Sequence, residues 1–583
     1  MLRHLLTRVA FGATIGAALL AAAGVVSPGF PPAWADTAPK AAAKLAQQES
    51  TLGSYLAGNH AIAANDRGAA ADYLLKALKQ DPDNEQLQRR VMWMLIGAGR
   101  AAEAVPLAAK LAARDNETPI AAILWALERA RAGDWAGAQQ RMAKAPQNNL
   151  GKFLMPLLQG WVEAGAGQTD KALETMKGAG ERSGNAVLRD LHSGMVMELA
   201  GRLDDAEKLY AQTVIAMPRM PLRMVEVIAG FFEKRGKMDE AVSLYRDYSA
   251  ENPESYYGEM LVKRAKEGKK APPVATNARE GLAEALFHFG SALQQDRSAD
   301  FAMILGRLAL YLRADLPVAQ VMVANILEAQ RRGEEANQVY QSISPKSWLT
   351  WSSRLRVAAN LEAMEKIAEA EALLRAMAKE LPERTDALTQ LGGLMRTKER
   401  FADAVAVYDD AVKRVPKVEQ RHWPLFYSRG IALERSKQWP RAEADFIRAL
   451  ELQPEQPYVL NYLGYSWVDQ GINLDRGMEM IRKAVEQRPT DGYIVDSLGW
   501  AHYRLKNYEN AVEHLERAVE LRPVDPTIND HLGDAYWKVG RTIEARFQWQ
   551  RAQGLKPEPD LAAQIVKKLR EGLSAAAPGP GGG

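Results

Sequence analysis

A small residue recurs every 34 positions through most of this 583-residue chain. This series of marker residues runs Ala70, Ala104, Ala138, Ala172, Ala206, Ala241, Ala302, Ala336, Ala370, Ala404, Ala442, Gly477, Ala511 and Ala545. The step is 34 or 35 except at two places, a gap of 61 before Ala302 and a step of 38 before Ala442. A fixed period of this length indicates a repeat architecture, and a chain this long exceeds what one hydrophobic core supports.

Three other kinds of residue recur at fixed distances from the marker residue. Many units carry a glycine twelve residues before it, a bulky residue four after it and a proline twelve after it, as in Gly392, Tyr408 and Pro416 around Ala404. The pattern predicts helix A, a short turn, helix B and a proline stop. Small residues let the two helices approach closely, and the bulky residue fills the space against the neighbouring pair. We therefore expect an all-α fold, a right-handed superhelical solenoid of about fourteen helix pairs with a concave side lined mostly by A helices.

The Leu-Gly pairs of helix A carry a family resemblance. They stand at Leu391-Gly392, Leu463-Gly464, Leu498-Gly499 and Leu532-Gly533. With the alanines and aromatic residue of helix B and the terminal proline, they resemble the tetratricopeptide repeat (TPR) family. The resemblance covers most of the chain after residue 35. Units 85–117 and 118–146 depart from it, because they lack the final proline at the expected place.

The N-terminus has the pattern of an export signal. Arg3 and Arg8 precede an uncharged run from Val9 to Val26, and the small-x-small triplet 33–35 follows. This predicts a secretory signal peptide over residues 1–35, cleaved after Ala35. The run is also just long enough to span a bilayer, so an uncleaved anchor in the inner membrane is the alternative. The chain has no cysteine, which excludes disulfides and lipidation and suits a bacterial periplasm.

The irregular stretch in the 61-residue gap predicts the domain organisation. Residues 254–281 combine a basic cluster with Ala271-Pro272-Pro273 and read as an irregular helix and a solvated linker. We expect a TPR block over 36–253, a second block with a capping helix over 282–573, and a disordered tail over 574–583.

Neither the composition nor the motifs indicate nucleic-acid binding, a metal site, a cofactor site or a catalytic site. The chain has 75 basic and 72 acidic residues, so no nucleic-acid footprint is expected. Eight scattered histidines without cysteine do not predict a metal site. No phosphate-binding loop or nucleophile elbow occurs in the sequence, and we predict neither a cofactor nor catalysis.

The candidate binding site is the predicted groove of the last three units. If the TPR register holds, the residues that face it are Tyr458, Asn461, Tyr465, Asp469, Tyr493, Asp496, Trp500, Tyr503, Arg504, Asp530, Asp534, Trp537 and Lys538. Rigid aromatic rings beside single charges suit the binding of a protein segment, and the aspartates favour one that carries Lys or Arg. The alternative is that some of these aromatic rings pack between adjacent A helices. The acids do not match the lysine and asparagine clamp of chaperone-binding TPR proteins.

The stretch from Leu460 to Ala552 resembles the C-terminal part of large bacterial cell-envelope TPR proteins. One of these is the lipoprotein adaptor of a carboxyl-terminal processing protease, although this chain lacks the lipidated cysteine. The resemblance implies a non-catalytic periplasmic scaffold or adaptor, with an envelope protease or assembly factor as partner. Membrane association is expected only through the N-terminal segment or a partner. The alternative function is a component of a polysaccharide export or assembly machine.

Overall fold

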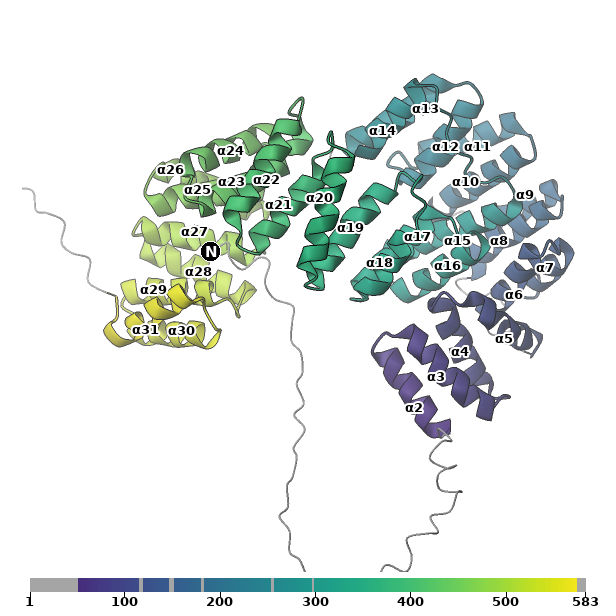
Figure 1. Ribbon diagram of the computed structural model, residues 1–583, viewed down its shortest axis with the longest axis horizontal. Helices are drawn as coiled ribbons and strands as arrows, with labels where there is room; N and C mark the ends of the chain where they lie inside the picture. The colour runs from purple at the N-terminus through teal and green to yellow at the C-terminus, as the bar shows by residue number, and fades with distance from the viewer. Residues whose placement is uncertain are drawn as a thin grey trace, which may run out of the picture. The chain divides into compact units, whose positions relative to one another are not determined.

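The computed structural model describes residues 51–114, 119–145, 151–179, 183–252, 256–295 and 298–573 (Figure 1). Within these ranges every regular element is a helix. The predicted signal peptide and C-terminal tail lie outside the described residues. The chain forms two compact units, which divide between Ala370 and Glu371 inside helix α20.

The helices of the unit that ends at Ala370 alternate as A and B helices, except for α14. They are α2 (Thr51–Ala63), α3 (Arg67–Gln80), α4 (Glu85–Gly97), α5 (Ala101–Arg114), α6 (Pro119–Arg131), α7 (Trp135–Met142), α8 (Gly151–Gly165), α9 (Thr169–Lys177), α10 (Ser183–Leu199), α11 (Leu203–Ala216), α12 (Leu222–Lys234), α13 (Met238–Glu251), α14 (Tyr256–Lys266), α15 (Ala278–Gln295), α16 (Ala299–Leu312), α17 (Pro317–Ala329), α18 (Gly333–Gln341) and α19 (Thr350–Ala363).

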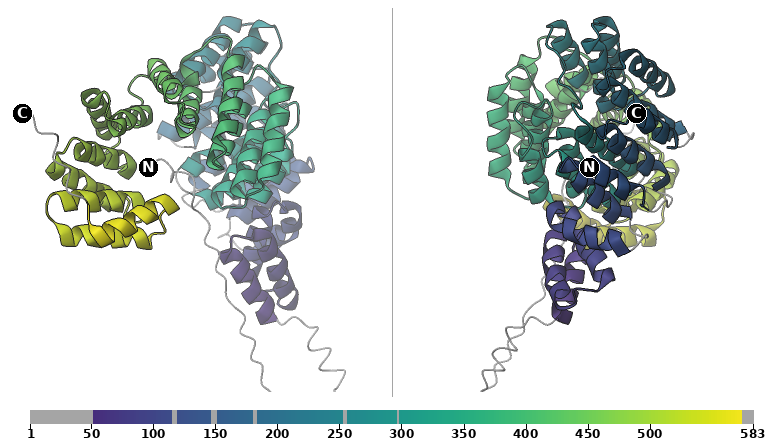
Figure 2. Two further views of the ribbon diagram at one scale, coloured as in Figure 1. Left: turned by 60° about the vertical axis from the view of Figure 1, so that its left-hand side comes forward. Right: turned by 90° about the vertical axis from the view of Figure 1, so that its right-hand side faces the viewer.

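The unit that begins at Glu371 takes in most of α20 (Ile367–Glu380). Its further helices are α21 (Asp386–Thr397), α22 (Phe401–Arg414), the short 3-10 helix η2 (Gln420–His422), α23 (Trp423–Arg435), α24 (Trp439–Leu452), α25 (Pro457–Gln470), α26 (Leu474–Gln487), α27 (Gly492–Arg504), α28 (Tyr508–Leu521), α29 (Pro526–Lys538), α30 (Thr542–Gly554) and α31 (Pro559–Glu571). Two further views show the same stacking of helices within each unit (Figure 2).

The marker residues confirm the predicted solenoid of fourteen helix pairs. Each of the fourteen lies in a B helix, and all thirteen marker alanines are fully buried. Among the described helices, two fall outside the pairs: α14 lies in the 61-residue gap, and α31 packs on α30 as the predicted cap. The fold is therefore an all-α TPR-type solenoid.

In many pairs the close approach of the two helices depends on a glycine of helix A. A Cβ atom at Gly392 would lie 2.5 Å from the ring of Tyr408, and one at Gly533 would lie 2.5 Å from Trp549. The bulky residue four after the marker thus covers the glycine of its own pair, rather than only the neighbouring pair as predicted. Tyr210 does both, because its ring also lies 4.9 Å from that of Phe231 in the next A helix. Burying one large ring against two helices joins successive pairs.

The turn between helices A and B repeats as regularly as the helices. A residue with positive φ stands five positions before most markers, such as Gly201 or Glu399. After helix B, Pro416 follows two residues beyond the end of α22, as the predicted proline stop requires.

Residues 254–281, the predicted break between blocks, lie inside one compact unit. The last turn of α14 carries Arg264, which bonds Oε2 of Glu233 at 2.9 Å and the hydroxyl of Tyr245 at 3.0 Å. The backbone N–H of Ala271 donates to Glu233 as well, at 2.9 Å. This part of the stretch is therefore bound to α12 and α13.

The only glycine among the markers provides a test of close packing. At Gly477 a Cβ would lie 2.9 Å from the carbonyl oxygen of Gly464 and 3.0 Å from a methyl of Val468. We expect Gly477→Ala to lower the free energy of unfolding by about 1–3 kcal/mol, because the two backbones must separate. The matched control is Gly554→Ala in α30, where no atom lies within 4 Å of the new Cβ and helix propensity favours alanine. Urea unfolding followed by circular dichroism measures both, and equal stability of the two variants would contradict the close-approach account.

Candidate protein-binding surface

In the unit that ends at Ala370, the chain itself covers the A helices. Helix α15 packs against α8 and α10, and α16 packs against α4, α5 and α6 (Figure 1). The contact is tight, since a Cβ at Gly281 of α15 would lie 2.2 Å from the ring of Trp161 in α8. The surface that an A-helix groove would offer to a partner is thus occupied here by later helices of the same chain.

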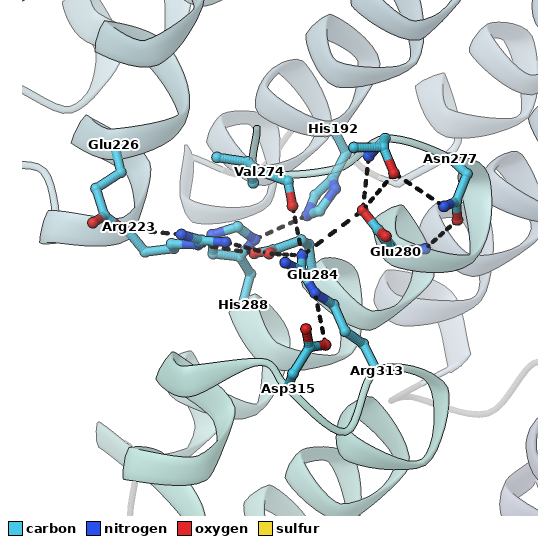
Figure 3. A network of polar contacts seen from close by, with 11 residues as sticks. His192, Arg223, Glu226, Val274, Asn277, Glu280, Glu284, His288, Arg313 and Asp315 are labelled. Atoms are coloured by element: carbon cyan, nitrogen blue, oxygen red, sulfur yellow. Dashed lines mark hydrogen bonds and ion pairs between the residues drawn. The ribbon is translucent and has the colours of Figure 1, made fainter. Parts of the chain in front are cut away.

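A buried ion pair holds α15 against α12 (Figure 3). Arg223 of α12 donates to both carboxylate oxygens of Glu284, from Nε at 3.1 Å and from Nη2, and donates to Glu226 at 3.0 Å. Glu284 is fully buried and Arg313 lies 3.8 Å from it. Burial opposes the charge of Arg223, but its two carboxylate partners outweigh this effect and raise the pKa of the guanidinium.

Two buried histidines continue this network (Figure 3). The indole N–H of Trp161 donates to Nδ1 of His192 at 3.1 Å, and Nε2 of His192 lies 3.3 Å from Nδ1 of His288 in α15. Burial lowers the pKa of both histidines to about 3, with mutual repulsion adding to it at His192 and Arg223 adding to it at His288. Both rings are therefore neutral near pH 7 and pass a hydrogen bond from α8 through α10 to α15.

The predicted site lies in the other unit, on α25, α27 and α29. We define the A-helix face as the surface of these three helices that carries the thirteen predicted residues. At its centre the ring of Trp500 is stacked between Tyr503, 4.7 Å away at 11°, and His531, 3.9 Å away at 15°. Trp500 and Tyr503 are each only partly buried. This part of the site fits both sequence interpretations, because the rings pack between adjacent A helices and still reach the surface.

The buried aspartates of this face already have partners within the chain. Asp496 is fully buried and accepts from Nδ1 of His531 at 3.1 Å. Burial raises the pKa of Asp496, and His531 opposes this shift. Lys568 of the capping helix donates to Asp530 and to Asp534, both at 2.8 Å. These three acids therefore have partners within the chain, and binding of Lys or Arg from another protein at this place stays a prediction.

The remaining predicted residues differ in exposure. Asp469 and Arg504 form an exposed ion pair at 2.6 Å between α25 and α27. Asn461 is buried, and burial raises the pKa of the partly buried Tyr465. Trp537 is partly covered by its neighbours, with Gly572 and the guanidinium of Arg546 against its ring, and Lys538 is partly buried.

Two Tyr–Arg pairs, one repeat apart, lie at the N-terminal ends of α25 and α27. The guanidinium of Arg488 lies 5.7 Å from the ring of Tyr458, and that of Arg522 lies 4.8 Å from the ring of Tyr493. Both arginines are exposed, and neither forms an ion pair with a carboxylate among the described residues. The sequence reasoning named both tyrosines but missed Arg488 and Arg522, which end the B helices. Their spacing of 34 residues was the available signal. His531 and Lys568 were also missed, since nothing local marks them as partners of the aspartates.

Within the described residues, no group of three His, Asp or Glu side chains is arranged to hold a metal ion. Among the same residues, no helix is both long enough and apolar enough to span a bilayer.

Comparison with known proteins confirms the repeats. The TPR repeat family matches residues 499–540, and the tetratricopeptide repeat family matches 358–419 and 427–492. The chain is 32% identical over 80 residues to the TPR repeat-containing protein PA4667 of Pseudomonas aeruginosa, which is 14% of each chain. It is 27% identical over 131 residues to the BBSome complex member BBS4 of Bos taurus, 22% of this chain and 24% of that protein. The chain thus spans less than a quarter of the length of these relatives.

Solved structures align over longer stretches. The APC/C hetero-tetramer Cut9-Hcn1 covers 91% of this chain and 98% of its own at 15% identity and a TM-score of 0.38. YrrB, described as a TPR protein with an unusual peptide-binding site, covers 33% of this chain and 97% of its own at 18% identity and a TM-score of 0.26. The family matches show that the chain contains tetratricopeptide repeats, and such a scaffold fits a protein-interaction role. TPR proteins are generally non-catalytic. The comparisons do not support the specific resemblance to a protease adaptor.

Removing one partner of the buried ion pair tests how α15 is held. Arg223→Leu leaves Glu284 buried without its main counter-charge, and we expect a loss of about 3–5 kcal/mol in the free energy of unfolding. The control Arg202→Leu removes an exposed arginine that pairs with Asp170 and Asp205, and it should cost no more than about 1 kcal/mol. The double variant Arg223→Leu/Glu284→Leu should recover most of the loss. Denaturant unfolding gives all three values, and equal effects of the two single variants would contradict the proposed role of the pair.

The cap contact predicts a pH dependence. Burial raises the pKa of Asp534 to about 6, Asp530 adds to the shift and Lys568 opposes it. Because this pKa exceeds the ordinary value, the folded chain binds more protons than the unfolded chain between about pH 4 and 6, so this group's contribution to stability falls as pH rises through that range. Asp534→Asn keeps an acceptor for the indole of Trp549 and removes the titration. Its melting temperature should fall less than that of the wild type over this range, whereas the exposed Asp469→Asn should follow the wild type. Parallel curves for Asp534→Asn and the wild type would exclude this titration.

Proposed function

We propose that this protein is a non-catalytic interaction scaffold of the bacterial cell envelope, which binds segments of other proteins along the A-helix face of α25 and α27. The repeated Tyr–Arg pairs carry the proposal. Tyr458 is 36% exposed, and its ring and that of Tyr493 each lie under an exposed guanidinium. Aromatic rings and arginines are the side chains that most often dominate protein interfaces.

The charges of this surface decide which partner segment suits it. Asp496, Asp530 and Asp534 are already paired internally, whereas Arg488 and Arg522 have no carboxylate partner in the described part of the chain. A segment that places acidic side chains opposite these arginines and apolar ones against the tyrosines fits better than a basic one. The spacing of the two pairs suits an extended segment that crosses one repeat.

The envelope location rests on the N-terminal sequence. A positive start, an uncharged run and the Ala33-Trp34-Ala35 triplet support export, and the absence of cysteine is compatible with a periplasmic chain. Fractionation of cells together with mass spectrometry of the mature N-terminus tests this part. A mature chain that begins at Asp36 in the periplasmic fraction supports it, and an intact chain in the cytoplasm contradicts it.

Charge reversal of the two arginines tests the binding proposal. We expect Arg488→Glu/Arg522→Glu to weaken capture of the partner at least tenfold, because attraction to the acidic segment becomes repulsion. The partner is first identified by a photoreactive residue at Tyr458, with one at Ile543 on helix α30 as the position control, since that side chain is 82% exposed. The matched charge control is Arg517→Glu on the B helix α28, where Arg517 pairs with Glu520. Equal capture by the double variant and the control would contradict the proposed surface.

A further inference from the structure

Three arginines gather in the unit that ends at Ala370, away from the A-helix face. Arg67 is the first residue of α3, Arg307 lies in α16, and Arg332 immediately precedes α18. The three positive charges repel one another. Burial is the main cause that lowers the pKa of Arg307 to about 10, and the charges of Arg332 and Arg67 lower it further. Helix α16 packs against α4, where the rings of Phe301 and Trp93 lie 5.9 Å apart. The three cations are therefore held together by the packing of helices distant in sequence.

The carboxylates around this cluster are one short of the cations. Asp300 accepts from Arg67, and Glu335 accepts from Nε and Nη2 of Arg332 at 2.7 and 2.6 Å. Arg307 has no hydrogen-bond partner among the described residues. Arg307 thus forms no ion pair of its own within the described part of the chain, and Glu335, which pairs with Arg332, only partly offsets the repulsion that Arg307 experiences. The neighbouring side chains of Arg67 and Arg332 are only 7% and 9% exposed.

Comparison with other repeats shows that Arg332 has fewer carboxylate partners than arginines at the same position of the repeat. Arginines at the same register, four before the marker, each meet two carboxylates. Arg202 pairs with Asp170 at 2.6 Å and Asp205 at 3.1 Å, and Arg400 pairs with Glu371 and Asp403, both at 2.8 Å. At Arg332 the acid in the preceding B helix is Asp300, which Arg67 takes instead. Arg332 therefore pairs with one carboxylate, where Arg202 and Arg400 each pair with two.

The guanidinium groups also have unused donors. Nη1 of Arg67, Nε of Arg307 and Nη1 of Arg332 are buried and have no hydrogen-bond partner among the described residues. The C-terminal end of α4 leaves room for two of these side chains, because a Cβ at Gly97 would lie 2.9 Å from Nη1 of Arg67 and one at Gly99 would lie 3.1 Å from Nη1 of Arg307. Arg307 as a whole is only partly buried, so solvent reaches the cluster. Buried donors without partners are costly, and an oxyanion would satisfy several at once.

We propose that Arg67, Arg307 and Arg332 form a binding site for a small oxyanion of the phosphate class. Planar guanidinium groups bind tetrahedral and carboxylate oxyanions through paired N–H donors, which suits three arginines better than a single charge would. A bound anion would join α3, α16 and the turn before α18. The site is independent of the proposed peptide surface.

Titration with inorganic phosphate at constant ionic strength tests the proposal on the full chain. Isothermal calorimetry should show saturable binding, and phosphate should raise the melting temperature relative to the same concentration of chloride. Arg307→Gln removes the uncompensated cation, so we expect binding at least tenfold weaker and no melting-temperature response. Arg307→Lys keeps the charge and should retain part of the response, and the control Arg202→Gln should respond like the wild type. Sulfate and acetate in parallel distinguish a tetrahedral oxyanion from a carboxylate.

The results for Arg307→Gln and for the other anions decide whether the three arginines form the proposed site. Without phosphate, Arg307→Gln should be at least as stable as the wild type, since it removes repulsion among the three cations. A melting-temperature response to phosphate that is equal in Arg307→Gln and the wild type would overturn the site. So would the absence of any response of the wild type to phosphate, sulfate or acetate. A response to acetate alone would replace phosphate with a carboxylate and contradict the class proposed.

Discussion

The close approach of helix A to helix B within each repeat is the constraint on which the rest of this structure depends. In many repeats a glycine of helix A lies under a large side chain of helix B, as in Gly430 under Phe446, and a fully buried marker residue stands four positions before that side chain. Phe446 also packs against Tyr462 of the next A helix, with ring centroids 5.0 Å apart. The same contact that closes one pair therefore attaches the following pair, and a stack of repeats results.

Stacking leaves the A helices with a free side, and the two units use it differently. In the unit that ends at Ala370, α15 and α16 cover this side, held through Arg223, Glu284 and the two neutral histidines. In the other unit, α25 and α27 keep partly exposed tyrosines beneath arginines, while the cap neutralises the aspartates of α29. The same type of repeat thus supports later helices of the chain in one unit, and in the other unit it carries the surface that we assign to partner binding.

The sequence was sufficient for those features that repeat locally. The markers predicted the helix pairs, because each repeat contacts mainly its neighbours and carries the information for that contact. The helical spacing of apolar residues within 560–573 predicted the cap. Contacts between distant repeats could not be predicted in this way. No periodic signal pairs Arg223 with Glu284, 61 residues away, or Lys568 with Asp530, 38 residues away. The aspartates predicted at groove positions lie on α27 and α29, but their partners within the chain come from other helices and could not be predicted.

Hydrogen exchange of the protein, with and without its captured partner, tests the central claim most directly. The account predicts slower exchange of backbone amides in α25 and α27 when the partner is bound, with no change in α8 and α10, which α15 already covers. Protection confined to α8 and α10, or no protection in α25 and α27 with a saturating partner, would contradict the assignment of the binding surface.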